Sequence, residues 1–130
     1  HLFDTWGEFP PESPIIIEGY DDGNARKGRI EDMYGTFEIA ENVHFHKGIF
    51  PKTASPVKDK TFSFVHLDAD LYISTLEGLK FFYPRMKRGG VIVIHDYLFD
   101  WVTKAIDEFF KDKVESPFAI SQGQVLIVKQ

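Results

Sequence analysis

Two runs of mainly apolar residues in this chain each end in side chains that can bind a metal. The run at 62–67 is followed by Asp68, and the run at 90–94 is followed by His95 and Asp96. Near-continuous apolar runs between turn signals predict strands of a parallel sheet, whose ligands bind outside the carboxyl ends. A right-handed crossover places two such strands side by side. The spacing therefore predicts a metal site where these strands end.

The donor set favours a hard divalent cation. Mg²⁺ takes oxygen ligands in octahedral geometry, which Asp68, Asp70 and Asp96 supply. An imidazole beside carboxylates also suits Mn²⁺, Fe²⁺ or Zn²⁺, so His95 leaves the identity of the metal open. Neighbouring strand residues point to opposite faces, so His95 and Asp96 meet at one point only if the strand has already ended. The alternative is a structural role, in which each aspartate caps a helix or hydrogen-bonds a loop. The presence of three aspartates at two strand ends makes this alternative weaker.

Several other side chains have a structural interpretation beside a functional one. His66 lies within an apolar run and is expected as a core histidine. His44 and His46 alternate, which indicates one half-exposed sheet face more than a metal pair. Trp101 is expected to pack, and Trp6 either packs or stacks on a flat ligand from its loop.

Helical spacing is clearest in the second half of the chain. Ser74 and Glu77 have the form of a capping box, which predicts a helix start, and the glycines at 89–90 predict its left-handed stop. Apolar residues at helical spacing predict a second helix over 101–111. The segment 118–128 reads as two strands joined by a turn, an antiparallel hairpin.

The first half is less regular. We expect a strand end at 1–4, a loop, a short β-branched segment at 15–17, a helix over 25–41 and a strand ending at Gly48. The order of elements predicts an α/β fold, doubly wound, with an antiparallel edge. We expect residues 1–130 to form a single domain.

Composition narrows the classes of function. The chain has 130 residues, 43% of them hydrophobic, and a net charge of −5 without a run of Lys or Arg. This disfavours nucleic acid and membrane surfaces as partners. There is no Cys, which excludes a disulfide framework and a thiolate metal site in this sequence. Together with the lack of a long apolar segment, this leads us to expect a cytoplasmic location.

Five segments together resemble the macrocin O-methyltransferase (TylF-type) family. They occur in the order and with the gaps of that family and cover nearly the whole chain, at 2–10, 45–51, 64–72, 82–97 and 105–109. The resemblance implies a Rossmann-like class I methyltransferase fold. It also implies S-adenosylmethionine as cofactor, frequently Mg²⁺, and a hydroxyl of a sugar or small natural product as methyl acceptor.

The resemblance also implies roles for individual residues. Asp68 corresponds to a metal ligand and to the base that receives the hydroxyl proton. His95 and Asp96 correspond to the other ligands, although the family commonly has Asp-Asp here. Asp4 corresponds to the acid that binds the cofactor ribose, with Trp6 as a neighbouring cofactor contact.

One feature of the family does not occur in this sequence, which is the first strand with its glycine-rich cofactor loop. We therefore expect the chain to be truncated at its N-terminus and to be the C-terminal part of the family's catalytic domain. Dimerisation is one hypothesis for closing such a sheet, which would make the protein a homo-oligomer. Two alternatives stay open: a degenerate methyltransferase-like domain for binding or assembly, and a nucleotide-sugar glycosyltransferase that uses the Asp68-Ala-Asp70 motif.

Overall fold

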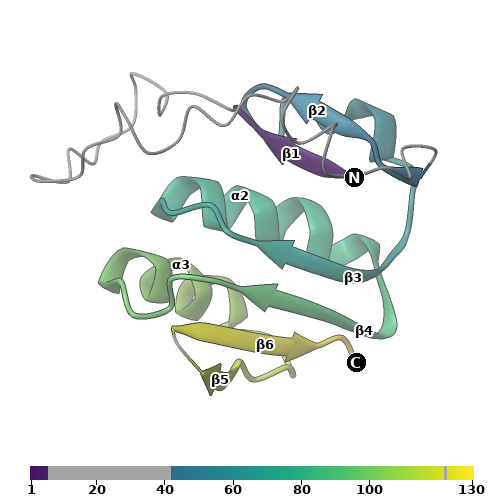
Figure 1. Ribbon diagram of the computed structural model, residues 1–130. Helices are drawn as coiled ribbons and strands as arrows, with labels where there is room; N and C mark the ends of the chain where they lie inside the picture. The colour runs from purple at the N-terminus through teal and green to yellow at the C-terminus, as the bar shows by residue number, and fades with distance from the viewer. Residues whose placement is uncertain (6–41, 122) are drawn as a thin grey trace, which may run out of the picture. The chain divides into compact units, whose positions relative to one another are not determined.

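The computed structural model describes residues 1–5, 42–121 and 123–130, which divide into two compact units (Figure 1). The units are His1–Lys58 and Asp59–Gln130. The segment predicted at 15–17, the helix predicted over 25–41 and Trp6 lie outside the described residues. Each unit is described by itself.

The first unit contains a two-stranded parallel sheet. Strand β1 (Leu2–Asp4) pairs with β2 (Phe45–Lys47), so that Phe3 lies opposite His46 with their rings stacked 4.5 Å apart. A 3₁₀ turn, η2 (Ser55–Val57), follows. The predicted strand end at 1–4 and the predicted strand before Gly48 are both confirmed.

The second unit is built on a four-stranded mixed sheet in the order β3-β4-β6-β5. Strand β3 (Phe62–Leu67) pairs in parallel with β4 (Met86–Ile94), and β4 pairs antiparallel with β6 (Gln124–Val128). Strand β5 (Phe118–Ser121) completes the antiparallel hairpin with β6. The predicted adjacency of the two acid-terminated strands and the predicted terminal hairpin are confirmed.

Two helices lie behind this sheet in Figure 1, α2 (Tyr72–Phe82) and α3 (Asp100–Phe110). Alternate strand residues are buried, which is the pattern of a sheet with one face packed on helices. The predicted spacing of α3 is confirmed, because four of its apolar side chains are buried in the core. The buried apolar side chains of the strands and of α3 are Val65, Leu67, Met86, Ile92, Ile94, Val125, Ile127, Val102, Ala105, Ile106 and Phe110.

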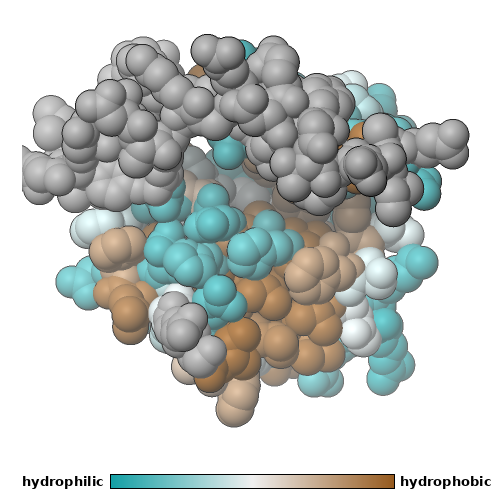
Figure 2. Space-filling view, in the orientation of Figure 1, coloured by the Kyte–Doolittle hydropathy of each residue, from teal (hydrophilic) through white to brown (hydrophobic). Residues whose placement is uncertain are grey.

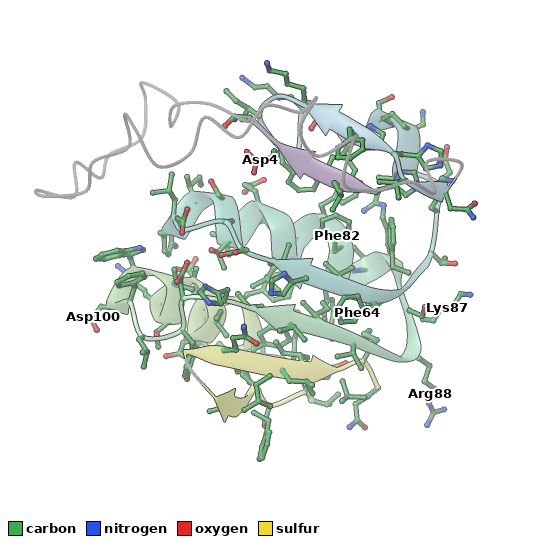
Figure 3. All side chains as sticks on the ribbon, viewed as in Figure 1. Asp4, Phe64, Phe82, Lys87, Arg88 and Asp100 are labelled. Atoms are coloured by element: carbon green, nitrogen blue, oxygen red, sulfur yellow. The ribbon has the colours of Figure 1, made fainter. Side chains whose placement is uncertain are left out.

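The other face of the sheet carries exposed apolar side chains. Phe64 is 62% exposed and Phe118 67% exposed, and Figure 2 shows the hydrophobic patch on the sheet face turned toward the viewer. Phe64 projects from β3 (Figure 3) and lies in register with Val91. His66, two residues after Phe64, is exposed as well. The prediction of a core histidine is therefore wrong, because His66 points to the exposed face of the sheet while its neighbours Val65 and Leu67 point into the core.

The predicted capping box is also wrong. Helix α2 begins at Tyr72 with Leu71 as its N-cap and has no side-chain cap bond. The amide of Thr75 donates to the Leu71 carbonyl at 2.9 Å, so the helix is already formed at Ser74. Glu77 instead pairs with Lys80 at 2.8 Å, one turn further along the surface of the helix.

The helix also ends earlier than the glycines predict. A 3₁₀ turn, η3 (Tyr83–Arg85), follows α2, and β4 starts at Met86. Met86 is buried, and the exposed side chains of Lys87 and Arg88 extend from the strand just after it (Figure 3). Gly89 does have a left-handed φ of +77°, but it lies inside the strand, where the pairing with β3 shifts register.

As to membranes, every helix in the described part of the chain is too short or too polar to span one.

Candidate metal centre

The parallel pairing of β3 and β4 brings their carboxyl ends together. Leu67 and Ile94 are in register at the last position of the pair. The next amide, that of His95, donates to the Leu67 carbonyl at 2.8 Å and holds the two chain segments side by side beyond the sheet. Asp68 follows β3 directly, so its side chain starts next to His95.

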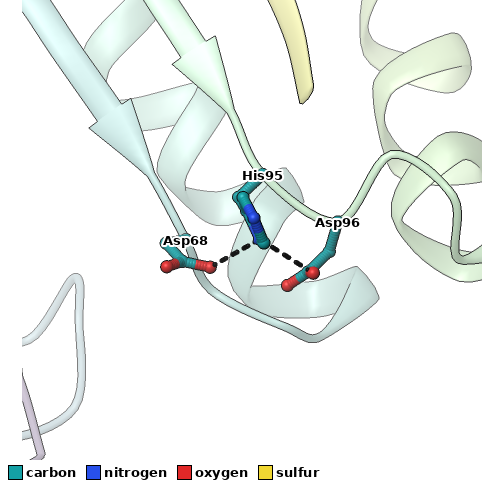
Figure 4. A group of neighbouring side chains, drawn as sticks. All are labelled: Asp68, His95 and Asp96. Atoms are coloured by element: carbon teal, nitrogen blue, oxygen red, sulfur yellow. Dashed lines mark ion pairs between the residues drawn. The ribbon is translucent and has the colours of Figure 1, made fainter. Parts of the chain in front are cut away.

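A change of backbone direction then places three side chains at one point. Asp96 has a φ of +62°, in the left-handed region that Asp tolerates better than most residues. This ends the strand alternation, so His95 and Asp96 both turn toward Asp68 (Figure 4). Nδ1 of His95 lies 2.8 Å from Oδ1 of Asp96 and 3.3 Å from Oδ1 of Asp68. Strand β4 ends at Ile94, so the condition under which His95 and Asp96 can meet at one point is fulfilled.

The donor atoms fit a small divalent cation. One ligand atom from each residue lies within 4.8 Å of the other two. Adjacent ligands bonded at about 2.1 Å to an octahedral ion are about 3 Å apart, similar to the two distances from Nδ1 of His95. That nitrogen is buried and makes no hydrogen bond of acceptable geometry, although both carboxylates are close. A buried nitrogen left in this state is suited to donate its lone pair to a cation.

The carboxyl group of Asp96 is the most sheltered of the cluster. Its side chain is 14% exposed, against 54% for Asp68. Burial raises the pKa of Asp96, as does the neighbouring carboxyl group of Asp70, while the charge of His95 acts in the opposite direction. A raised pKa favours the protonated, neutral form of this carboxyl group. A cation at this point would compete with that proton.

The loops that carry the cluster are held by further hydrogen bonds. The amide of Tyr97 donates to the Gly123 carbonyl at 2.7 Å, and the amide of Phe99 donates to the Asp96 carbonyl at 2.9 Å. Nε1 of Trp101 donates to the carbonyl of Asp70 at 2.8 Å. The sequence predicts only packing for Trp101. No local signal marks this bond, because its two residues are 31 positions apart.

The remaining predicted site residues are placed differently. Asp4 is exposed at the end of β1 in the first unit, where its backbone carbonyl accepts from the Gly48 amide at 2.9 Å. Trp6 lies outside the described residues. His44 and His46 flank the ring of His1, at centroid distances of 4.7 and 5.2 Å. Within the described ranges, the group with metal-binding geometry is Asp68, His95 and Asp96.

The fold is shared with solved structures of O-methyltransferases. The structure of the O-methyltransferase NovP covers 98% of this chain with a TM-score of 0.81 at 22% sequence identity, and the chain covers 58% of NovP. A putative caffeoyl-CoA O-methyltransferase from Staphylococcus aureus matches with a TM-score of 0.64 at 15% identity, over 77% of this chain and 57% of its own.

The sequence comparisons identify the family. The model of the macrocin O-methyltransferase (TylF) family matches residues 24–123, and the chain belongs to this family. An 8-demethyl-8-(2,3-dimethoxy-alpha-L-rhamnosyl)-tetracenomycin-C 4'-O-methyltransferase of Streptomyces olivaceus is 31% identical over 62% of the chain. A demethyldecarbamoylnovobiocin O-methyltransferase of Streptomyces niveus is 34% identical over 55% of it. The matched segments span 32% and 28% of these two relatives.

Proposed function

We propose that the protein is an S-adenosylmethionine-dependent O-methyltransferase that acts on a sugar hydroxyl of a natural product with the help of a divalent cation, Mg²⁺ in the first instance. The observation that carries the proposal is the convergence of Asp68, His95 and Asp96 in a chain of the TylF family. A sugar hydroxyl as methyl acceptor is supported by the name of the Streptomyces olivaceus relative, which mentions a rhamnosyl group and 4'-O-methyl transfer.

The exposure of the three side chains suggests which of them act as metal ligands and which as general base. A bound cation would lower the pKa of the acceptor hydroxyl and orient its oxygen. Asp96, which is mostly buried, and Nδ1 of His95 provide fixed ligand atoms. Asp68 is the most accessible of the three, and its carboxylate has a second oxygen that can receive the hydroxyl proton. Asp68 is therefore proposed as both ligand and general base.

Methyl transfer to an activated oxygen is mainly a matter of alignment. The bond between the His95 amide and the Leu67 carbonyl fixes the spacing of the two strand ends. The bonds of Tyr97 and Phe99 fix the loop after β4. These contacts hold the ligand atoms on rigid elements, as a site that must position two reactants requires.

The cofactor contacts are proposed from the family. Asp4 ends a parallel strand, a position from which a carboxylate can accept hydrogen bonds from both hydroxyls of a ribose. Trp6 is proposed as its neighbour in the cofactor site.

The proposal is tested by binding and transfer measurements on the same preparation. Calorimetry with S-adenosylhomocysteine is expected to show binding that Mg²⁺ strengthens, and labelled methyl groups are expected to reach a rhamnosylated acceptor. Asp68→Asn is expected to abolish transfer. Asp112→Asn, a charge-matched change just beyond the far end of α3, which is about 16 Å long, is expected to leave it unchanged.

Two outcomes would contradict the proposal. Thermal stabilisation by a UDP-sugar with Mn²⁺, without any by S-adenosylhomocysteine, would favour a glycosyltransferase. Stabilisation by neither ligand would favour a degenerate domain kept for binding or assembly.

A further inference from the structure

Trp101 connects α3 to the turn between β3 and α2. Its indole Nε1 donates to the backbone carbonyl of Asp70 at 2.8 Å. Trp101 is the second residue of α3, while Asp70 lies in the short turn that separates β3 from α2. A side chain from one helix therefore holds the backbone at the entrance to the other.

The turn that Trp101 holds has an unfavourable backbone conformation. Asp70 has a φ of +57°, in the left-handed region, and the amide of Leu71 donates to the Ala69 carbonyl at 2.6 Å. Non-glycine residues adopt this conformation at a cost, so the surrounding contacts must favour it. The indole N–H supplies one such contact directly at the carbonyl of the left-handed residue.

The same turn sets the position of two carboxyl groups, one in the metal-binding cluster and one beside it. Asp68 begins it, and the carboxyl group of Asp70 is near enough to that of Asp96 to raise its pKa. On the opposite side, Phe99 stacks on Trp101 with centroids 5.0 Å apart and an interplanar angle of 6°, and its amide donates to the Asp96 carbonyl. The stacked pair is thus bonded to the backbone of both acidic loops.

We infer that Trp101 is a positioning residue of the metal site: its indole N–H fixes the Asp68–Asp70 turn and thereby the spacing of the carboxylates. The inference rests on the proposed function for the identity of the ligand, a divalent cation. It concerns a residue that does not touch the cation and acts through the Asp70 carbonyl.

The test compares Trp101→Phe with Tyr72→Phe. The first keeps an aromatic ring against Phe99 and removes the N–H. The second also removes one hydrogen bond to α3, which the Tyr72 hydroxyl donates to Glu108 at 2.6 Å. That bond does not involve the acidic cluster. Each change removes one hydrogen bond and keeps an aromatic ring at its position, but only Trp101→Phe removes the bond to the turn.

Two readouts are measured on the whole chain. Without metal, amide hydrogen exchange at Leu71 is expected to be about tenfold faster in Trp101→Phe and unchanged in Tyr72→Phe. With Mn²⁺ as the probe, electron paramagnetic resonance is expected to show that Trp101→Phe binds Mn²⁺ about 10–100-fold more weakly. This is the usual effect of losing a residue that orients the metal ligands without binding the metal itself.

The outcomes separate this inference from the proposed function. Unchanged exchange at Leu71, or unchanged Mn²⁺ affinity despite faster exchange, overturns the role of Trp101. If the unsubstituted chain binds no Mn²⁺, the proposed metal site fails, and the exchange at Leu71 alone decides whether Trp101 fixes the turn.

Discussion

The buried carboxylate of Glu115 gives the sharpest quantitative prediction. Its side chain is 1% exposed and accepts three hydrogen bonds: from the Tyr83 hydroxyl at 2.6 Å, from Nζ of Lys129 at 2.7 Å and from the Gln130 amide at 3.1 Å. These contacts connect the segment after α3 to the end of α2 and to the last residues of the chain. Replacing Glu115 by Gln keeps the shape of the side chain and removes its charge.

The size of the effect follows from the pKa of the carboxyl group. Burial raises the pKa of Glu115, but the hydrogen bonds from Lys129, Tyr83 and the Gln130 amide outweigh it and lower the pKa from 4.5 to about 2. A difference of this size corresponds to at most about 3 kcal/mol of stability. Because Lys129 can still reach solvent, we expect Glu115→Gln to lower the free energy of unfolding by about 2 kcal/mol at pH 7.

The sign of the pH dependence follows from the same pKa. A carboxyl group whose pKa is lower in the folded state stabilises the fold above its unfolded pKa, near 4.5, and loses that contribution as the pH falls toward 2. Urea unfolding followed by tryptophan fluorescence at pH 7, 4.5 and 3 measures this directly. The difference between the unsubstituted chain and Glu115→Gln should be largest at pH 7 and shrink at pH 3.

A matched control exists on the surface of the same unit. The exposed carboxylate of Glu108 accepts a hydrogen bond of the same length, 2.6 Å, from the Tyr72 hydroxyl. Glu108→Gln should have a much smaller effect, because solvent replaces the lost interaction. An equal loss in both variants, or a difference for Glu115→Gln that does not change with pH, would show that the charge of Glu115 does not stabilise the fold.

Three further predictions concern the core, the strand backbone and the candidate metal centre. In urea unfolding, Ile106→Ala should cost about 2–5 kcal/mol, and Leu98→Ala, at a side chain 79% exposed, should cost far less; similar costs would contradict the described core. By thermal unfolding, Gly90→Ala should lower the melting temperature more than Gly78→Ala. The new Cβ at position 90 would lie 2.8 Å from a backbone oxygen, whereas at position 78, in α2, it would meet the end of the flexible Leu67 side chain at 3.1 Å. The reverse order would contradict the described packing of β4. Mn²⁺ should raise the melting temperature, EDTA should reverse the rise, and Asp68→Asn should remove it; a rise that survives this substitution would place the cation elsewhere.

Much of the second unit could be predicted from sequence because its pattern is dictated by burial. The apolar runs before Asp68 and His95 predict adjacent parallel strands, and the 3.6-residue spacing within 101–111 predicts α3. In both cases the side chains that define the pattern are those that enter the core. The convergence of acids at one edge of the sheet follows from the strand pairing.

The features that sequence did not predict depend on single backbone angles and on distant contacts. The left-handed φ of Asp70 starts α2 before the Ser74 motif, and the left-handed φ of Asp96 turns two neighbouring residues to the same side. No periodicity encodes either angle. The bond from Trp101 to Asp70 and the burial of Glu115 join residues far apart in the chain, so only the folded structure brings them together.

Anomalous diffraction from crystals grown with Mn²⁺ can show whether Asp68, His95 and Asp96 bind one divalent cation. We expect a single strong anomalous peak within bonding distance of Nδ1 of His95 and of one carboxylate oxygen each from Asp68 and Asp96. A peak bound by other side chains, or no peak at Mn²⁺ concentrations that saturate binding in solution, would contradict it.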